Sequence, residues 1–555
     1  MAEASRRLTQ AAVSAAVLPA AGLMLGLALW AAFVLRHGFT MTPDSMSYAA
    51  LARGFDAGHP FSSALAWPGV RWGGMQSVWP PLYPAVLAAL HAAGLSVVTA
   101  EFATSGLAWG LAVALGALCV RAAAGRFPWV ALPILAGFAG GLSVAGSGWS
   151  ESACLALLGA HYWLAATAWR RGAAPARALW FAQALAVGLA FLDRYAVAPL
   201  LVTAVLLPLW AGPGEPRRLR RRILDGAVPA LLGILAGALP WTVLALATVG
   251  RVGAAYLPVG AGLSGALWMA VSAAGHAAAD TANFIAPSNI HTPQVLPALV
   301  VACTAAAVGV WALTARRDRP APAAAPAVPL LLLLAVDAVL YTALLVALRA
   351  RYFFDPIGVR LMAPALYPAL LAVLWLLAAL PRRGLALALA LPLAALILAQ
   401  GLLSVTRDAH PSIVRAELQG PWCTPAPAGD CGLLDWLGQH ARPGTAVITD
   451  NEFDINLQLG MATYQLEPYP YAAVAGAVTL TAAAAGWVAA HPGASVLVAL
   501  YAPPGSAPSD AYGPLVAQLW SQQTVSLGSG YTATQIATGP AFRVLLLGGP
   551  GAPAA

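Results

Sequence analysis

Residues 11–35 read AAVSAAVLPAAGLMLGLALWAAFVL, and residues 39–55 follow as FTMTPDSMSYAALARGF. The first stretch is long and apolar enough to cross a bilayer, whose hydrocarbon core of about 30 Å takes roughly 20 helical residues. The second stretch repeats its apolar residues at helical spacing, at Tyr48, Leu51, Ala52 and Phe55. This spacing predicts an amphipathic helix that lies at the membrane interface.

The composition of the whole chain agrees with a membrane protein. Of 555 residues, 60% are hydrophobic and 9% are charged, whereas a soluble domain is about half apolar and about a quarter charged. The mean hydropathy is +0.75. The net charge of +8 comes from arginine alone, because the sequence contains no lysine. The arginines gather between apolar runs, which is typical of cytoplasmic loops and not of nucleic-acid binding.

The apolar runs and the arginine clusters together predict about eleven spans with a cytoplasmic N-terminus. The first run follows Arg6 and Arg7, but it exceeds the core of a signal peptide, so we expect an uncleaved helix. The segment 80–94 is interpreted as a short helix that does not cross. The predicted spans are 11–35, 97–120, 128–147, 150–169, 178–193, 195–211, 223–249, 295–315, 328–348, 361–380 and 384–404.

The chain after residue 405 is no longer membrane-like, and we expect residues 1–404, with a first outer loop at 36–96, and residues 405–555 to form separate domains. Strand-like runs (TAVITD, SVLVALY, FRVLLLG) alternate with a helix-like run (LLDWLGQHA), which predicts an α/β domain. Cys423 and Cys431 flank a turn on the predicted outer side, where a disulfide can form. The fold class expected is therefore a polytopic α-helical membrane protein with a C-terminal extracytoplasmic α/β domain.

Asp44 opens the predicted interfacial helix, between Pro43 and Ser45. A carboxylate in this position serves either as a helix N-cap or as a reactive group held at the mouth of the helical bundle. The spacing leaves both interpretations open. Asp337 falls in the middle of a predicted span, and there we favour a structural hydrogen bond.

An acid in the first outer loop soon after the first span, with Tyr48 four residues later, resembles the GT-C membrane glycosyltransferases. Closest is the protein-mannosyltransferase and aminoarabinose-transferase-like group, glycosyltransferase family 39-like. The run PPLYP at 80–84 and the run DPIGVRLMAPALYP at 355–368 are also similar to that group. The resemblance implies about eleven spans and an inverting glycosyltransferase that takes a sugar from a polyprenyl-phosphate carrier. Such chemistry needs a base for the acceptor hydroxyl and cations for the departing phosphate.

By this resemblance Asp44 is the catalytic base, and Glu151, in GWSESACLALL, is a second acid that orients the acceptor or binds a metal. The residue types alone also allow Glu151 to be a carboxylate favoured by a helix dipole. Many relatives carry an acidic pair in the first loop, where this chain has Ser45. No cofactor is therefore certain, and a divalent metal on Asp44 and Glu151 stays open.

The donor phosphate requires cations at the outer interface, and in the absence of lysine these are arginines, whose forks suit phosphate oxygens. We rank them by their place in the motifs; Arg194 also has a neighbouring acid, Asp193, that could simply neutralise it. The expected donor phosphate-binding residues are Arg360, Arg194, Arg349 and Arg351. The expected contacts with the acceptor or within the loop are Tyr48, His59 and Tyr83.

The sequence contains no Walker loop, nucleophile elbow, HExxH motif or convincing dinucleotide fingerprint. The alternatives are a secondary transporter or lipid flippase, and a catalytically silent binding protein. A transporter commonly shows repeated halves and polar residues near the midplane, and no repeat is visible here. The expected partners are a polyprenyl-phosphate sugar donor, membrane lipids, and a lipid, glycan or protein acceptor, without nucleic acid. The expected location is the bacterial inner membrane, with the C-terminal domain outside the cytoplasm.

Overall fold

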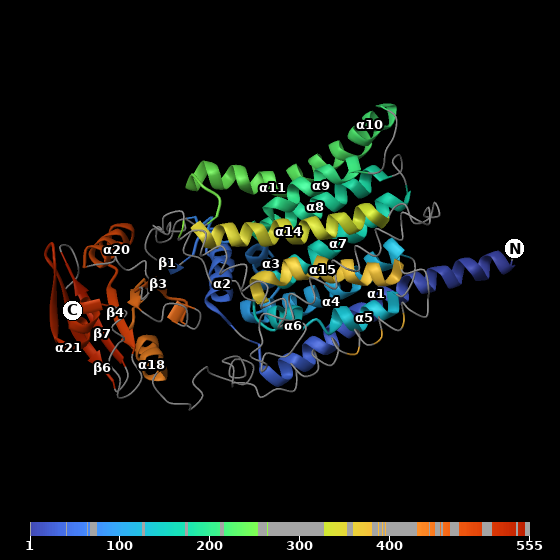
Figure 1. Cartoon of the computed structure of the whole chain (residues 1–555). Coiled ribbons are helices and arrows are strands. Elements are labelled where there is room, and N and C mark those ends of the chain that lie inside the picture. The colour runs from blue at the N-terminus through green and yellow to red at the C-terminus, as the bar shows by residue number, and fades with distance from the viewer. Residues whose placement is uncertain are drawn as a thin grey trace. The chain divides into compact units, whose positions relative to one another are not determined.

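A computed structural model of the chain (Figure 1) divides into two compact units. The helical unit comprises Met1–Thr40, Pro80–Tyr83 and Glu101–Ser412, and the sheet unit comprises Met41–Trp79, Pro84–Ala100 and Ile413–Ala555. The residues that the structure describes are 2–39, 41–63, 65–66, 75–124, 128–171, 176–210, 216–253, 327–351, 359–379, 430–442, 444–449, 459–466, 477–501, 513–539 and 542–549, together with 264, 387, 391, 395, 455 and 456.

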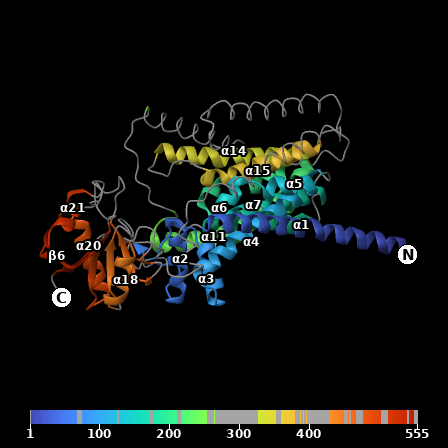
Figure 2. The same ribbon diagram turned by 90° about the horizontal axis from the view of Figure 1, so that it is seen from below.

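The helical unit is built from apolar helices that pack side by side (Figures 1 and 2). Five helical stretches in the described residues are long and apolar enough to cross a membrane: Ala16–Arg36, Val97–Ala123, Leu219–Val249, Leu330–Leu348 and Arg360–Ala378. The helices and short helical turns are α1 (Ala2–His37), α4 (Val97–Ala124), α5 (Pro128–Ala136), α6 (Ala139–Ala145), α7 (Glu151–Arg171), α8 (Arg177–Asp193), η2 (Tyr195–Val197), α9 (Ala198–Leu206), η3 (Leu207–Trp210), α10 (Pro216–Arg222), η4 (Ile223–Ala227), α11 (Val228–Val249), α14 (Ala327–Arg351) and α15 (Val359–Ala379).

Most of the predicted spans in described residues coincide with helices, and one differs in its continuity. The span expected over 128–147 is divided into α5 and α6, because the extended backbone of Phe138 (ψ 100°) interrupts the helix. The segment 80–94 forms the short helix α3 (Leu82–Ala92), which at about 17 Å is too short to cross. The spans predicted at 295–315 and, for the most part, 384–404 lie outside the described residues.

Glycines let neighbouring helices of the helical unit approach closely, as small residues do in membrane helix packing. A Cβ added to Gly237 of α11 would lie 3.1 Å from the Cα of Gly188 in α8, and a Cβ added to Gly233 would overlap the carbonyl oxygen of Phe181. The α8–α11 pair is therefore held at a separation that only glycine permits at these positions.

Replacing Gly233 by alanine is expected to destabilise the helical unit by roughly 1–3 kcal/mol, since the backbone of α8 must move. The matched control is Gly486→Ala, because Gly486 also lies in a helix, α20 (Ala477–Ala490), where an added Cβ meets nothing within 4 Å. That control is expected to leave the midpoint of thermal unfolding unchanged or raise it, since alanine favours helix by up to about 1 kcal/mol. Unfolding in detergent followed by circular dichroism measures both; equal shifts would refute the close-packing interpretation.

A buried hydrogen-bonded cluster joins four helices in the middle of the helical unit. Asp337 of α14 is fully buried. Its carboxylate accepts hydrogen bonds from the hydroxyl of Thr203 in α9 at 2.6 Å and from the hydroxyl of Tyr162 in α7 at 3.2 Å. His161 of α7 reaches the backbone of Gln183 in α8. The structural hydrogen bond expected of Asp337 is confirmed.

In the sheet unit, the loop after α1 forms the expected helix, α2 (Pro43–Asp56). The N-cap is Thr42 and not Asp44: the Thr42 hydroxyl accepts from the backbone of Ser45, and the Ser45 hydroxyl accepts from the backbone of Thr42 at 2.5 Å. Pro43 occupies the first helical turn, where its fixed φ suits the helix and no hydrogen-bond donor is lost. The capping interpretation of Asp44 is therefore wrong, and its carboxylate lies in the first turn of the helix.

The rest of the sheet unit surrounds one seven-stranded sheet with the order β1-β3-β2-β4-β7-β6-β5. The first four strands in that order are parallel, and β7, β6 and β5 continue the sheet antiparallel. Strand β1 comes from the loop before α3, and its residue Leu65 pairs with Thr463 of β3. The elements are β1 (Leu65–Ala66), α18 (Asp430–His440), β2 (Ala446–Thr449), β3 (Ala462–Gln465), α20, β4 (Val496–Tyr501), α21 (Gly513–Ser521), β5 (Thr524–Gly528), β6 (Tyr531–Thr538) and β7 (Phe542–Gly548).

Helices cover both faces of this sheet. Successive side chains of a strand point to opposite faces, and both faces of the central strands are apolar. Val447 of β2 packs with Leu433 of α18 on one face, and Ile448 packs with Leu480 of α20 on the other. Figure 1 shows α18 and α20 on either side of the strands. The C-terminal α/β arrangement expected from the sequence is confirmed, whereas the domain boundary at 404/405 falls outside the described residues and stays a prediction.

Candidate functional site

A buried carboxylate in the helical unit is held by two arginines that are distant in sequence. Oε1 of Glu151 accepts a hydrogen bond from Nη1 of Arg194 at 2.5 Å and another from Nε of Arg360 at 2.7 Å. The Glu151 side chain is completely buried, and the two arginine side chains are 11% and 23% exposed. Glu151, Arg194 and Arg360 are called the Glu151 triad below.

Helix ends bring the Glu151 triad together. Glu151 is the first residue of α7, Arg194 follows the last residue of α8, and Arg360 lies in the first turn of α15. Helices α7 and α8 pack against each other, so the start of one lies near the end of the other when they run antiparallel. A carboxylate at the start of α7 is also favoured by the helix dipole. The three charges therefore gather at one end of the bundle.

Two aromatic residues also contact the arginines. Nε of Arg194 donates to the hydroxyl of Tyr341 in α14 at 2.8 Å. The guanidinium of Arg360 lies 4.5 Å from the centroid of the Trp149 ring, a cation–π distance. Both contacts fix the orientation of a guanidinium. Neither residue was predicted from the sequence, although Tyr341 lies one helical turn after Asp337 and Trp149 lies two residues before Glu151.

The two guanidinium groups of the Glu151 triad suit an anionic ligand by the geometry of their donors. One carboxylate faces two guanidiniums, so the triad carries a net charge of +1, and guanidinium forks match phosphate and carboxylate oxygens. Asp193 is buried next to Arg194 in sequence and interacts electrostatically with Arg194 and Glu151, so in its ionised form it offsets this charge. Arg194 nevertheless donates a hydrogen bond to Glu151, so Asp193 alone does not account for the position of Arg194.

The same arrangement does not fit a divalent metal at Glu151. A cation there would lie beside two guanidiniums, which repel it. Within the described part of the chain, no group of three His, Cys, Asp or Glu residues could hold a metal ion.

The candidates of the first loop lie in the sheet unit. Asp44 is half-buried in the first turn of α2. Tyr48, one turn later, is buried with its ring edge-to-face with Trp79 at 5.4 Å. His59 is exposed, and its carbonyl oxygen accepts a hydrogen bond from the backbone of Ser62. Asp44 and the Glu151 triad thus belong to different compact units, and their joint action stays a prediction.

The remaining candidates divide between described and undescribed positions. Tyr83, in the helical unit, is buried, and its hydroxyl lies 3.3 Å from that of Ser105. Arg349 and Arg351 lie in the last turn of α14, but their side chains are outside the described part, as is the expected disulfide between Cys423 and Cys431.

The fold of the chain, apolar helices with a C-terminal α/β domain, has counterparts among solved structures. The chain is similar to two crystal structures of ArnT from Cupriavidus metallidurans. The one bound to undecaprenyl phosphate aligns with a TM-score of 0.54 at 14% identity, covering 95% of this chain and 97% of that one. The apo structure aligns with a TM-score of 0.54 at 15% identity, covering 97% and 98%. No protein-family model and no curated protein matches the chain.

Proposed function

We propose that this chain is an inverting glycosyltransferase that moves a sugar from a polyprenyl-phosphate donor to an acceptor outside the cytoplasm of a bacterium. The observation that carries the proposal is the Glu151 triad, an anion-binding arrangement at the end of an apolar helical bundle. The ArnT fold supports it, because one ArnT structure is described as bound to undecaprenyl phosphate.

In the proposed reaction the Glu151 triad holds the donor phosphate. A guanidinium carries five N–H donors, so an arginine oriented by a carboxylate still presents donors to an oxyanion. Glu151 fixes Arg194 and Arg360, Tyr341 supports Arg194, and Trp149 supports Arg360. As the bond between the anomeric carbon and the phosphate oxygen breaks, its electron pair goes to that oxygen, and the arginines stabilise the added charge.

Asp44 is proposed as the general base that takes the proton from the acceptor hydroxyl while its oxygen attacks the anomeric carbon. The first turn of a helix is favourable for a carboxylate, and the N-cap of α2 is Thr42 and not Asp44. Attack from the face opposite the phosphate inverts the anomeric carbon. The proposal covers any sugar on the polyprenyl-phosphate carrier and an acceptor hydroxyl on a lipid, glycan or protein.

The test compares wild type with Arg360→Gln in nanodiscs, using a panel of polyprenyl-phosphate sugars and native membrane extract as acceptor. We expect wild type to release polyprenyl phosphate, and Arg360→Gln to raise the donor KM by roughly 10- to 100-fold, as expected for one lost charged hydrogen bond. The control is Arg220→Gln, an exposed arginine in α10.

Equal donor KM in wild type and Arg360→Gln would exclude the triad as the phosphate site. Uptake into proteoliposomes that is driven by an ion or substrate gradient, without any sugar transfer, would exclude the transferase activity. It would support a transporter.

A further inference from the structure

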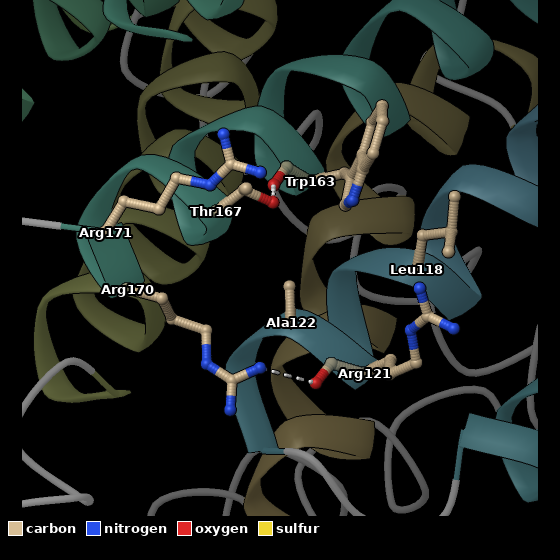
Figure 3. Close-up of a pocket in the computed structure, with 7 residues that line it drawn as sticks. All are labelled: Leu118, Arg121, Ala122, Trp163, Thr167, Arg170 and Arg171. Carbon is tan, nitrogen blue, oxygen red and sulfur yellow. Dashed lines mark hydrogen bonds between the residues drawn. The ribbon is translucent and has the colours of Figure 1, made fainter. Parts of the chain in front are cut away.

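A second cluster of arginines lies at the other end of α7. Arg121 of α4 and Arg170 and Arg171 of α7 line a cavity of about 460 Å³, a volume within the range of small-molecule sites. The other lining residues are Leu118, Ala122, Trp163 and Thr167. Figure 3 shows the three guanidiniums around this opening between the two helices. It is called the arginine cavity below.

The side chains that line the arginine cavity are rich in positive charge. Among its lining residues in the described part of the chain there are three arginines and no acid. Arg170 and Arg171 are exposed, and Arg170 donates through Nη1 to the backbone oxygen of Arg121 at 3.4 Å, which ties the ends of α4 and α7 together. Like charges that line one cavity repel each other. An anion bound among them would remove that repulsion.

The position of the cavity relative to the bilayer favours a lipid as its ligand. From Glu151 to Arg171, α7 has 21 residues, a rise of about 30 Å, which equals the thickness of a bilayer core. If the Glu151 triad lies at one interface, the arginine cavity lies at the other. Basic pockets between membrane helices bind anionic lipid headgroups.

On both helices, the residues that line the cavity change from charged at the helix end to mostly apolar farther along the helix. Trp163 and Thr167 lie about two turns and one turn before Arg171 along α7, and Leu118 lies one turn before Arg121 along α4. The arginines therefore form the rim, and the apolar side chains continue toward the centre of the helices. A free phosphate ion would use the rim alone, whereas an acyl-chain lipid would use both.

We propose that the arginine cavity binds the phosphodiester headgroup of an anionic glycerophospholipid, whose acyl chain lies along Leu118, Ala122 and Trp163. This site is separate from the Glu151 triad, and the inference does not depend on the proposed transferase activity. Guanidinium groups provide bidentate contacts to the phosphate oxygens. Thr167 also lines the cavity, and its hydroxyl donates to the backbone oxygen of Trp163 at 2.8 Å.

The test uses the full chain in detergent, stripped of lipid and then exposed to phosphatidylglycerol, phosphatidylcholine, polyprenyl phosphate or inorganic phosphate. Retained lipid is counted by native mass spectrometry, and the thermal midpoint is measured in parallel. The variant is Arg170→Gln with Arg171→Gln. The control is Arg220→Gln with Arg221→Gln, which removes the same charge from exposed positions in α10.

We expect wild type and the control to retain phosphatidylglycerol and be stabilised by it, and the cavity variant to bind it roughly tenfold more weakly. Equal weakening in variant and control would mean general surface attraction and would overturn the proposal. So would stabilisation by inorganic phosphate as strong as that by phosphatidylglycerol. Retention of polyprenyl phosphate in place of phosphatidylglycerol, lost in the cavity variant, would show that the proposed occupant is wrong.

Discussion

Asp44→Asn is expected to lower the rate of sugar transfer by roughly 10²- to 10⁴-fold, the usual contribution of a general base. The amide keeps the size of the side chain but takes no proton at neutral pH. The fold should be retained, because Thr42 caps α2 and a first-turn carboxylate contributes only about 0.3–1 kcal/mol. The measurement is released polyprenyl phosphate per unit time, with donor binding and thermal unfolding followed in the same samples.

The matched control is Asp56→Asn, the same chemical change at the last residue of the same helix. Asp56 is 46% exposed and pairs with His91 at 3.1 Å, an exposed contact that contributes little. We expect this variant to turn over at the wild-type rate. If Asp44→Asn turned over as fast as Asp56→Asn, the base would have to be another residue.

The second large effect is expected for Glu151→Gln, because it leaves two poorly exposed guanidiniums without their shared carboxylate. Removing one partner of a buried ionic group is expected to cost about 3–5 kcal/mol of stability. Transfer should also fall by roughly 100-fold or more, since both arginines lose the group that orients them. The thermal midpoint and the turnover rate are the two measurements.

A double variant separates the structural effect from the chemical one. Glu151→Gln combined with Arg360→Gln removes one charge of each sign, so part of the lost stability should return while transfer stays low. The control is Asp225→Asn, which breaks an ion pair with Arg177, whose side chain is 66% exposed; we expect a loss of about 1 kcal/mol or less. Recovery of transfer together with stability in the double variant would argue that Glu151 acts only in folding.

The five described helices that are long and apolar enough to cross a membrane could be predicted from the sequence, because each is a local pattern of apolar residues. The division of 128–147 could not, since the break at Phe138 is a backbone conformation inside a run that is apolar throughout. Likewise, strands β2, β4 and β7 are continuous apolar runs and were predicted, whereas β3, β5 and β6 are rich in Thr, Gln and Ser. Their pairing depends on neighbouring strands and not on their own composition.

The residues of the candidate site could be predicted by type, but the contacts between them could not. Arg360 and Arg194 were predicted as arginines of the outer interface, ranked by their motifs, and Glu151 was predicted from the resemblance. Nothing in the sequence, however, pairs Arg360 with an acid 209 positions away. Tyr341 was missed because a tyrosine in an apolar helix is usually a packing residue. Its contact with Arg194 exists only once α14 packs beside the end of α8.

Strand β1 restricts how the chain can be threaded through a bilayer. Its backbone is hydrogen-bonded to β3, and Nη1 of Arg53 in the same loop donates to the backbone oxygen of Asn456 at 2.9 Å. Partners in one sheet share one aqueous compartment, so the chain must cross the membrane an even number of times between Ala66 and Ala462. The spans predicted from 97–120 to 384–404 obey this parity. Any revision of that set must add or remove spans in pairs, because otherwise β1 and β3 would lie on opposite sides of the membrane and could not pair.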